Sequence, residues 1–204
     1  MHADNLVNEL CFDLSRFNSK VYSMSNFVNS LVNHEDNGNL LSYEQTIKYA
    51  EFPVLGLHPD EKEIFGEDIH VEHDEVFRAL DWLKSKGVTD IIELTVPDRL
   101  VNPHDEQKIG EYVGKFKIEV LDWKFLDMSI ATFRTPSDSE GKDADSTGGN
   151  SLHRIRELHL YSSGKRAVIS HWLGPDGVPS LPNVRCIEIQ AFFFSPPSIQ
   201  ILTI

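Results

Sequence analysis

The chain has 204 residues, of which 40% are hydrophobic and 10% aromatic, so it can bury the core of one ordinary domain with a smaller segment beside it. Its formal net charge of −13 excludes a surface built to bind nucleic acid or an anionic membrane. The first residues lack a secretory signal, and Cys11 and Cys186 form no metal or redox spacing. We therefore expect a cytoplasmic protein in a reducing environment.

Residues 1–50 are predicted to form a helical segment. Apolar side chains recur every three or four residues from Leu6 to Phe17 and again from Val21 to Val32, which indicates two amphipathic helices. Ser42 is a candidate N-cap for a short helix over Tyr43 to Tyr49. Residues 51–72 are rich in proline, glycine and acidic side chains and are predicted to form an acidic connector.

Residues 73–190 are predicted to alternate strands with helices. Val76, Ala79, Leu80 and Leu83 form one apolar stripe that ends before Gly87, and a second helix is expected after Pro103. Its buried face is predicted to contain Ile109, Tyr112, Val113 and Phe116. A short segment capped by Asp127 should turn Ile130 and Phe133 inward, and a last helix should run from Lys165 to Leu173, between a cap at Ser162 or Ser163 and a stop at Gly174.

Four apolar segments have the composition of buried strands. They are Ile91 to Val96, Ile118 to Trp123, Ile155 to Tyr161 and Val184 to Ile189. Strands joined through helices run parallel. Aligning Glu93, Glu119, Glu157 and Cys186 gives steps of 26, 38 and 29 residues, and the longest step contains residues 136–150, a polar insert predicted to be disordered.

This spacing falls in the range of leucine-rich repeats, in which stacked units share one core. No unit carries the complete repeat signature, and an ordinary small α/β layer with four parallel strands explains the pattern equally well. Residues 191–204 form an atypical apolar tail without charge. The tail should either pack as a strand or reflect where the chain was cut, and we favour the second because the last unit lacks a closing helix.

The sequence contains no recognisable active site. No Gly-x-Ser-x-Gly motif is present, and Ser151 follows glycines of the polar insert. Phosphate-binding glycine motifs are also missing. Cys186 is expected to be a small buried hydrophobic residue rather than a nucleophile. We therefore predict no catalytic, cofactor-binding or metal-binding residue.

Histidines and aromatic residues supply weaker candidates. His70 and His73, with Glu67 or Asp74, could hold zinc, although capping of an acidic helix start is the favoured interpretation. His104 and His171 are isolated histidines, which are seldom catalytic. The aromatic side chains at strand and helix ends are expected to close the core, with a partner surface as the alternative: Trp123, Tyr161 and Trp172.

Several segments resemble the non-catalytic region that precedes the protease domain in fungal subtilisin-like serine proteases of the S8 peptidase family. The resemblance lies in Phe77 to Val88 with Ile92 to Asp98, in Val120 to Asp127 and in Arg156 to Val168, and it extends over roughly residues 43–190. It departs from that family at Lys165 and Arg166, where paired asparagines are usual.

The family's catalytic Asp-Thr-Gly, His-Gly-Thr and Gly-Thr-Ser motifs do not occur in this chain. The resemblance therefore implies a recognition or regulatory module that acts on a protein partner or on a protease domain in cis, without a cofactor. Two alternatives stay open: an autonomous protein-interaction repeat domain, and a hydrolase with a metal site near His70 and His73. The oligomeric state is not predicted.

Overall fold

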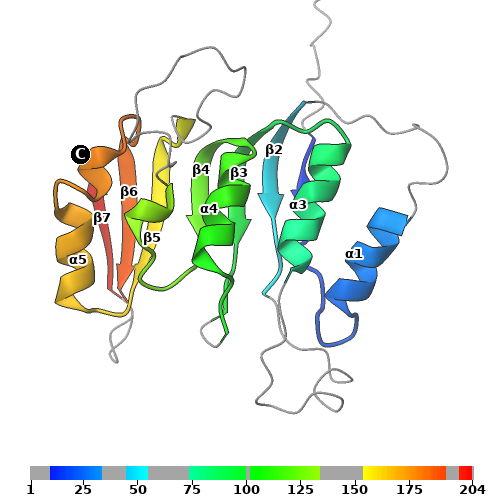
Figure 1. The fold of residues 1–204 in the computed structure, drawn as a ribbon. Helices are drawn as coiled ribbons and strands as arrows, with labels where there is room; N and C mark the ends of the chain where they lie inside the picture. Colours follow the sequence, from blue (N-terminus) through cyan, green and yellow to red (C-terminus); the bar gives the residue numbers. More distant parts are fainter. Residues whose placement is uncertain are drawn as a thin grey trace, which may run out of the picture.

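The computed structural model describes residues 10–33, 45–54, 74–99, 102–133, 154–191 and 198–203. Seven strands form one sheet, and their order in the sheet is their order in the sequence (Figure 1). The strands are β1 (Phe12–Asp13), β2 (Thr46–Glu51), β3 (Asp90–Val96), β4 (Lys117–Trp123), β5 (Glu157–Ser162), β6 (Cys186–Ala191) and β7 (Ser198–Thr203). The helices are α1 (Met24–Asn33), α3 (Glu75–Ser85), α4 (Glu106–Gly114) and α5 (Arg166–Leu173), with the 3-10 turns η2 (Ile130–Phe133) and η5 (Val178–Ser180).

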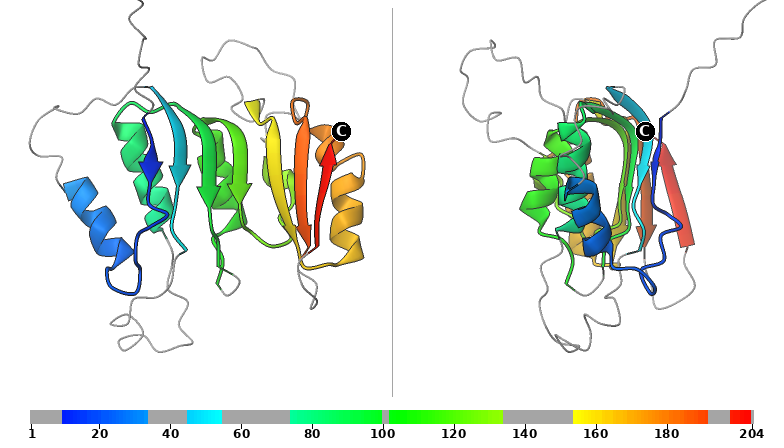
Figure 2. Two further views of the ribbon diagram at one scale, coloured as in Figure 1. Left: turned by 180° about the vertical axis from the view of Figure 1, so that it is seen from behind. Right: turned by 90° about the vertical axis from the view of Figure 1, so that its right-hand side faces the viewer.

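The predicted α/β class is confirmed: strands β1 to β6 are parallel and alternate with helical segments. The described helices cover one face of the sheet (Figure 2). This arrangement follows from the strand order, because right-handed crossovers that always advance in one direction place every connecting helix on the same side. The opposite face of the sheet carries no described helix.

Five parallel strands, with the residues directly beside them, turn apolar side chains inward at the same three positions, separated by three and then two residues. These inward positions are Ile47, Ala50 and Phe52; Ile91, Leu94 and Val96; Ile118, Leu121 and Trp123; Ile155, Leu158 and Leu160; and Val184, Ile187 and Ile189. The spacing is that of the strand core in leucine-rich repeats. Each strand alone offers a narrow apolar stripe, so the core forms only when neighbouring units and their helices pack together.

The observed register corrects our alignment of the four repeats. Glu93 lies opposite Val120, not opposite Glu119, and Val120 lies opposite Glu157, which pairs with Cys186. The error arose because we aligned acidic residues. The buried positions set the register instead, since a shift by one residue would turn the apolar side chains of the strand toward water.

Local signals explain the helices that were predicted correctly. Helix α3 ends before Gly87, as expected, and the φ of 93° at this residue suits glycine. Helix α4 begins after Asp105, whose carboxylate accepts a hydrogen bond from the backbone N–H of Lys108. The short segment η2 buries Ile130 and Phe133, as predicted.

The N-terminal helical prediction is only partly correct. Helix α1 confirms the helix over Val21 to Val32, but Phe12 and Asp13 form strand β1 rather than a helix. The expected helix over Tyr43 to Tyr49 is wrong, because Thr46–Glu51 form strand β2. Strand β2 pairs with β3 along its length and contributes Ile47 and Ala50 to the core.

Two further expectations near the C-terminus are corrected. Neither Ser162 nor Ser163 caps α5, since Lys165 holds the N-cap position and its side chain makes no capping hydrogen bond. Within the tail, Ser198–Thr203 form strand β7, which runs antiparallel to β6, so the alternative of a packed strand, which we had not favoured, holds for these residues. The last repeat is therefore closed by a strand instead of a helix. The acidic connector beyond residue 54 and the insert 136–150 lie outside the described residues.

Candidate recognition surface

The face of the sheet opposite the helices presents three rows of side chains, which we call the open face. They occupy the positions between the buried residues of β2 to β6. The amino row contains Lys48, Ile92, Glu119, Arg156 and Arg185. The middle row contains Tyr49, Glu93, Val120, Glu157 and Cys186, and the carboxyl row contains Glu51, Thr95, Asp122, His159 and Glu188. All of these residues are at least partly exposed.

Half of the ten side chains in the middle and carboxyl rows are acidic. Glu51, Asp122 and Glu188 lie in the carboxyl row, with Glu93 and Glu157 beside them in the middle row. Parallel strands lie about 4.8 Å apart, so these carboxylates form a compact field rather than scattered surface charge. Such a field attracts cations and basic protein segments.

His159 lies between two of these carboxylates. Its Nε2 atom is 2.9 Å from Glu157 Oε1, and its Nδ1 atom is 3.8 Å from Glu188 Oε2. The imidazole side chain is 17% exposed, which limits its contact with water. The three residues come from adjacent positions on β5 and β6, so the strand register itself brings them together.

Tyr161 connects β5 to β4 at the place where their pairing ends. The two strands pair directly only at Val120 with Glu157 and at Leu121 with Leu158. Further along, the Tyr161 hydroxyl donates a 2.6 Å hydrogen bond to Asp122 Oδ1. Burial, followed by the neighbouring Asp122 carboxylate, raises the pKa of the tyrosine well above its usual value.

Cys186 is partly exposed in the middle row, so the expectation of a buried residue is wrong. Burial, and then the charges of Glu157 and Glu188, raise the pKa of its thiol. A raised pKa lowers the thiolate fraction at neutral pH and does not suit a nucleophile. Neither Cys186 nor Cys11 forms a disulfide in the described part of the chain.

The sequence had indicated that His104 is isolated, but the structure gives it a close partner. Its Nδ1 atom lies 3.0 Å from Asp98 Oδ1, and the side chains of both residues are almost fully buried. Asp98 also accepts hydrogen bonds from the indole of Trp123 and from the backbone N–H of Arg99. This buried pair fastens the loop after β3 to the end of β4. It has no access for a substrate and is structural.

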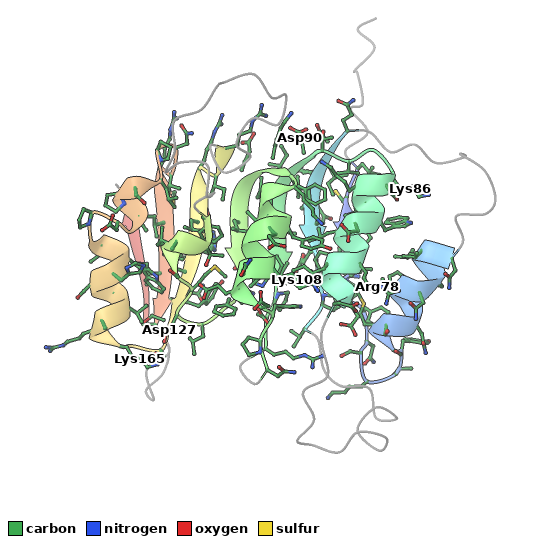
Figure 3. All side chains as sticks on the ribbon, in the orientation of Figure 1. Arg78, Lys86, Asp90, Lys108, Asp127 and Lys165 are labelled. Carbon is green, nitrogen blue, oxygen red and sulfur yellow. The ribbon has the colours of Figure 1, made fainter. Side chains whose placement is uncertain are left out.

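A polar cluster around Asp127 lies at the carboxyl end of β5. Asp127 accepts hydrogen bonds from the backbone N–H and the hydroxyl of Ser163, at 2.8 and 2.5 Å, and its carboxylate lies 3.4 Å from Lys165 Nζ (Figure 3). Burial alone would raise the pKa of Asp127, but Ser163 and Lys165 hold it below its usual value. Every strong contact is internal, and the cluster ties β5 to the segment after β4.

The strand order argues against a nucleotide-type crevice. In open α/β sheets such crevices form where the strand order reverses and successive helices leave on opposite faces. Here β1 to β6 advance in one direction without a reversal. The accessible chemistry of the described sheet therefore lies on the open face and along the strand ends.

The structure also gives the positions of the aromatic and histidine candidates that the sequence suggested. Trp123, Tyr161 and Trp172 are 1%, 3% and 0% exposed, which confirms that they close the core. His171 is exposed on α5, whereas His70, His73 and Ser151 lie outside the described residues.

Within residues 10–33, 45–54, 74–99, 102–133, 154–191 and 198–203, no cluster of three potential metal ligands occurs. None of the helices in the described part is both long and apolar enough to cross a membrane.

Comparisons with family models, with curated proteins and with solved structures gave no match. The fold itself therefore defines the class: a single α/β layer built from strand and helix units. The open face was not identified from the sequence. The signal that could have revealed it is the recurrence of charged side chains at fixed positions between the buried residues of successive strands.

Proposed function

We propose that this chain is a non-catalytic recognition module that binds a basic segment of a protein partner on its open face. The observation that carries this proposal is the acidic field formed by Glu51, Glu93, Asp122, Glu157 and Glu188. These carboxylates are displayed on strands, and strands hold side chains in fixed positions more rigidly than loops do.

Charge complementarity selects the occupant. The open face carries five carboxylates in its middle and carboxyl rows, and Glu93 is exposed. A partner with lysine or arginine side chains at the spacing of neighbouring strands would neutralise this field, and electrostatic attraction would speed its association. An acidic partner would be repelled by these carboxylates, and an apolar partner would bury them without supplying basic groups.

The resemblance to the region upstream of fungal subtilisin-like proteases extends the proposal to one partner class. The module would then restrain or position a serine endopeptidase domain, in cis or as a separate protein. Its lack of the family's catalytic motifs supports a role in recognition rather than in peptide cleavage. A cytoplasmic location fits two cysteines that form no disulfide in the described structure.

Binding to designed peptides tests the recognition face directly. A lysine-serine peptide and a matched glutamate-serine peptide are titrated into the protein by calorimetry at low and high salt. We expect the lysine peptide alone to bind, with an affinity that falls as salt rises. The double variant Glu93→Gln/Glu188→Gln should weaken binding by about tenfold.

The matched control removes two acidic groups from the helix layer, Asp74→Asn and Glu111→Gln. Asp74 makes no capping hydrogen bond, and Glu111 accepts a hydrogen bond from Gln107 on its own helix. This control should bind the lysine peptide like the wild type. Equal losses in both double variants would show that only net charge matters and would refute a specific face.

A purified subtilisin-like catalytic domain tests the extension to proteases. We expect it to bind the wild-type chain and to lose this binding with Glu93→Gln/Glu188→Gln. If the lysine peptide binds while the catalytic domain does not, the recognition face stands and the protease assignment is rejected.

A further inference from the structure

The amino ends of β4, β5 and β6 form a cavity of about 170 Å³ that is independent of the acidic field. Its walls are Glu119, Arg154, Arg156, Asn183 and Arg185. The volume equals that of several water molecules, at about 30 Å³ each. Three guanidinium groups and one carboxylate give these walls a net charge of +2, in a chain whose total charge is −13.

The backbone holds two of the arginines at a fixed separation. Arg156 donates its backbone N–H to the carbonyl oxygen of Glu119 at 2.8 Å, and Arg185 donates to the carbonyl oxygen of Arg156 at 2.8 Å. These residues therefore occupy neighbouring positions in the amino row, about 4.8 Å apart. Guanidinium groups on such positions can reach a single ligand placed between them.

The carboxylates nearest to two of these arginines lie farther away than in a strong charge-assisted hydrogen bond. Arg156 lies 3.6 Å from Glu119, and Arg154 lies 3.4 Å from Asp90 at the upper edge of the sheet (Figure 3). Charge-assisted hydrogen bonds are typically about 2.7 to 2.9 Å long. Within the described part of the chain, the exposed Arg185 side chain forms no hydrogen bond or ion pair. The cavity therefore holds one uncommitted guanidinium and two weakly engaged ones.

We propose that this cavity binds a phosphate monoester group. A phosphate monoester carries a charge of about −1.5 to −2 near neutral pH, which matches the charge of the cavity walls. The planar guanidinium fork donates paired hydrogen bonds to phosphate oxygens. A single carboxylate would leave one arginine charge uncompensated, so the phosphate is favoured over a carboxylate ligand.

Calorimetric titration at low ionic strength tests the site with three probes: inorganic phosphate, O-phosphoserine and acetate. We expect both phosphate compounds to bind with one-to-one stoichiometry and acetate to bind at least about tenfold more weakly. Arg185→Gln and Arg156→Gln should each reduce phosphate affinity by about tenfold. Tighter binding of phosphoserine than of inorganic phosphate would identify an esterified ligand, whereas equal affinities would identify the free ion.

Arg166→Gln is the matched control, because Arg166 is an exposed arginine on α5 outside the cavity. It should leave phosphate binding unchanged. Circular dichroism of each variant establishes that it is folded, and within the described residues the exposed Arg185 side chain can be replaced without loss of a hydrogen bond or ion pair. The proposal is overturned if folded wild type binds no phosphate, if acetate binds equally well, or if Arg166→Gln weakens binding as much as Arg185→Gln.

Discussion

The indole nitrogen of Trp123 donates a 3.0 Å hydrogen bond to Asp98 Oδ2, which joins the end of β4 to the loop that follows β3. The other carboxylate oxygen of Asp98 faces His104. Burial raises the pKa of Asp98, but the hydrogen bond and charge of His104 and the backbone N–H groups of Arg99 and His104 outweigh this effect and hold the pKa below its usual value. The ionised carboxylate is therefore part of the folded structure.

Asp98→Asn should lower the free energy of unfolding by about 3 kcal/mol at pH 7, because it leaves buried donors without their charged acceptor. A lowered pKa means that Asp98 stabilises the fold above about pH 4 and loses this effect as pH falls through the folded-state value. The difference between wild type and variant should therefore shrink from pH 7 to pH 3 in urea titrations. If the stability difference between wild type and Asp98→Asn stays constant across this range, Asp98 does not stabilise the fold through its ionised form.

Tyr161→Phe removes the hydroxyl that bridges β5 to Asp122 on β4. The loss of one hydrogen bond to a charged group should destabilise the protein by about 2 kcal/mol in urea unfolding. Because the tyrosine pKa is raised in the folded state, its contribution is complete below about pH 10 and disappears at higher pH. Wild type should thus lose stability above pH 10 more steeply than Tyr161→Phe.

Tyr22→Phe provides the control for this experiment. The Tyr22 side chain is 63% exposed and contacts the ring of Phe17. Its hydroxyl can be removed with an effect within about 0.5 kcal/mol. If both variants lose the same stability, the hydrogen bond to Asp122 contributes nothing of its own.

The strands β3 to β6 could be predicted because each carries enough apolar side chains to be recognised alone. Strand β2 could not. The spacing of three between Ile47 and Ala50 also fits a helix, and only pairing with β3, which begins at Asp90, decides in favour of a strand. Strand β1 has two residues and depends in the same way on its pairing with β2. Contacts between distant residues, rather than local propensity, determine these elements.

The functional surfaces also could not be predicted from the sequence without knowledge of the strand register. Arg156 and Arg185 precede their strands by one residue each, but their proximity follows only once Glu157 is paired with Cys186. His104 had an obvious neighbour in Asp105, whereas its actual partner is Asp98 on the other side of the loop. Such pairs depend on how the loop after β3 closes, which local sequence patterns do not specify.

Cys186 should react slowly with iodoacetamide near neutral pH, because burial and the charges of Glu157 and Glu188 disfavour its thiolate. The rate is measured in a Cys11→Ser background so that one thiol is followed. Glu157→Gln/Glu188→Gln should speed the reaction roughly threefold or more by removing the repulsion. The control Asp74→Asn/Glu111→Gln should leave the rate unchanged. A rate that does not respond to the open-face variant would show that these carboxylates do not act on the thiol.

Gly110 lets α4 approach η2 more closely than any other residue would allow. A Cβ atom at this position would lie 2.3 Å from the backbone oxygen of Thr132, so Gly110→Ala must push the two segments apart. We expect a loss of about 2 to 3 kcal/mol in the free energy of unfolding.

Gly114, at the end of the same helix, is the matched control. A Cβ atom there would meet no heavy atom within 4 Å. Alanine has the higher helix propensity and restricts the unfolded chain, so Gly114→Ala should stabilise the protein by up to about 1 kcal/mol. Chemical unfolding of both variants gives the test. If Gly110→Ala lowers the free energy of unfolding and Gly114→Ala raises it, the contact with Thr132 causes the destabilisation at Gly110. Equal destabilisation by both variants would mean that α4 does not pack closely against η2.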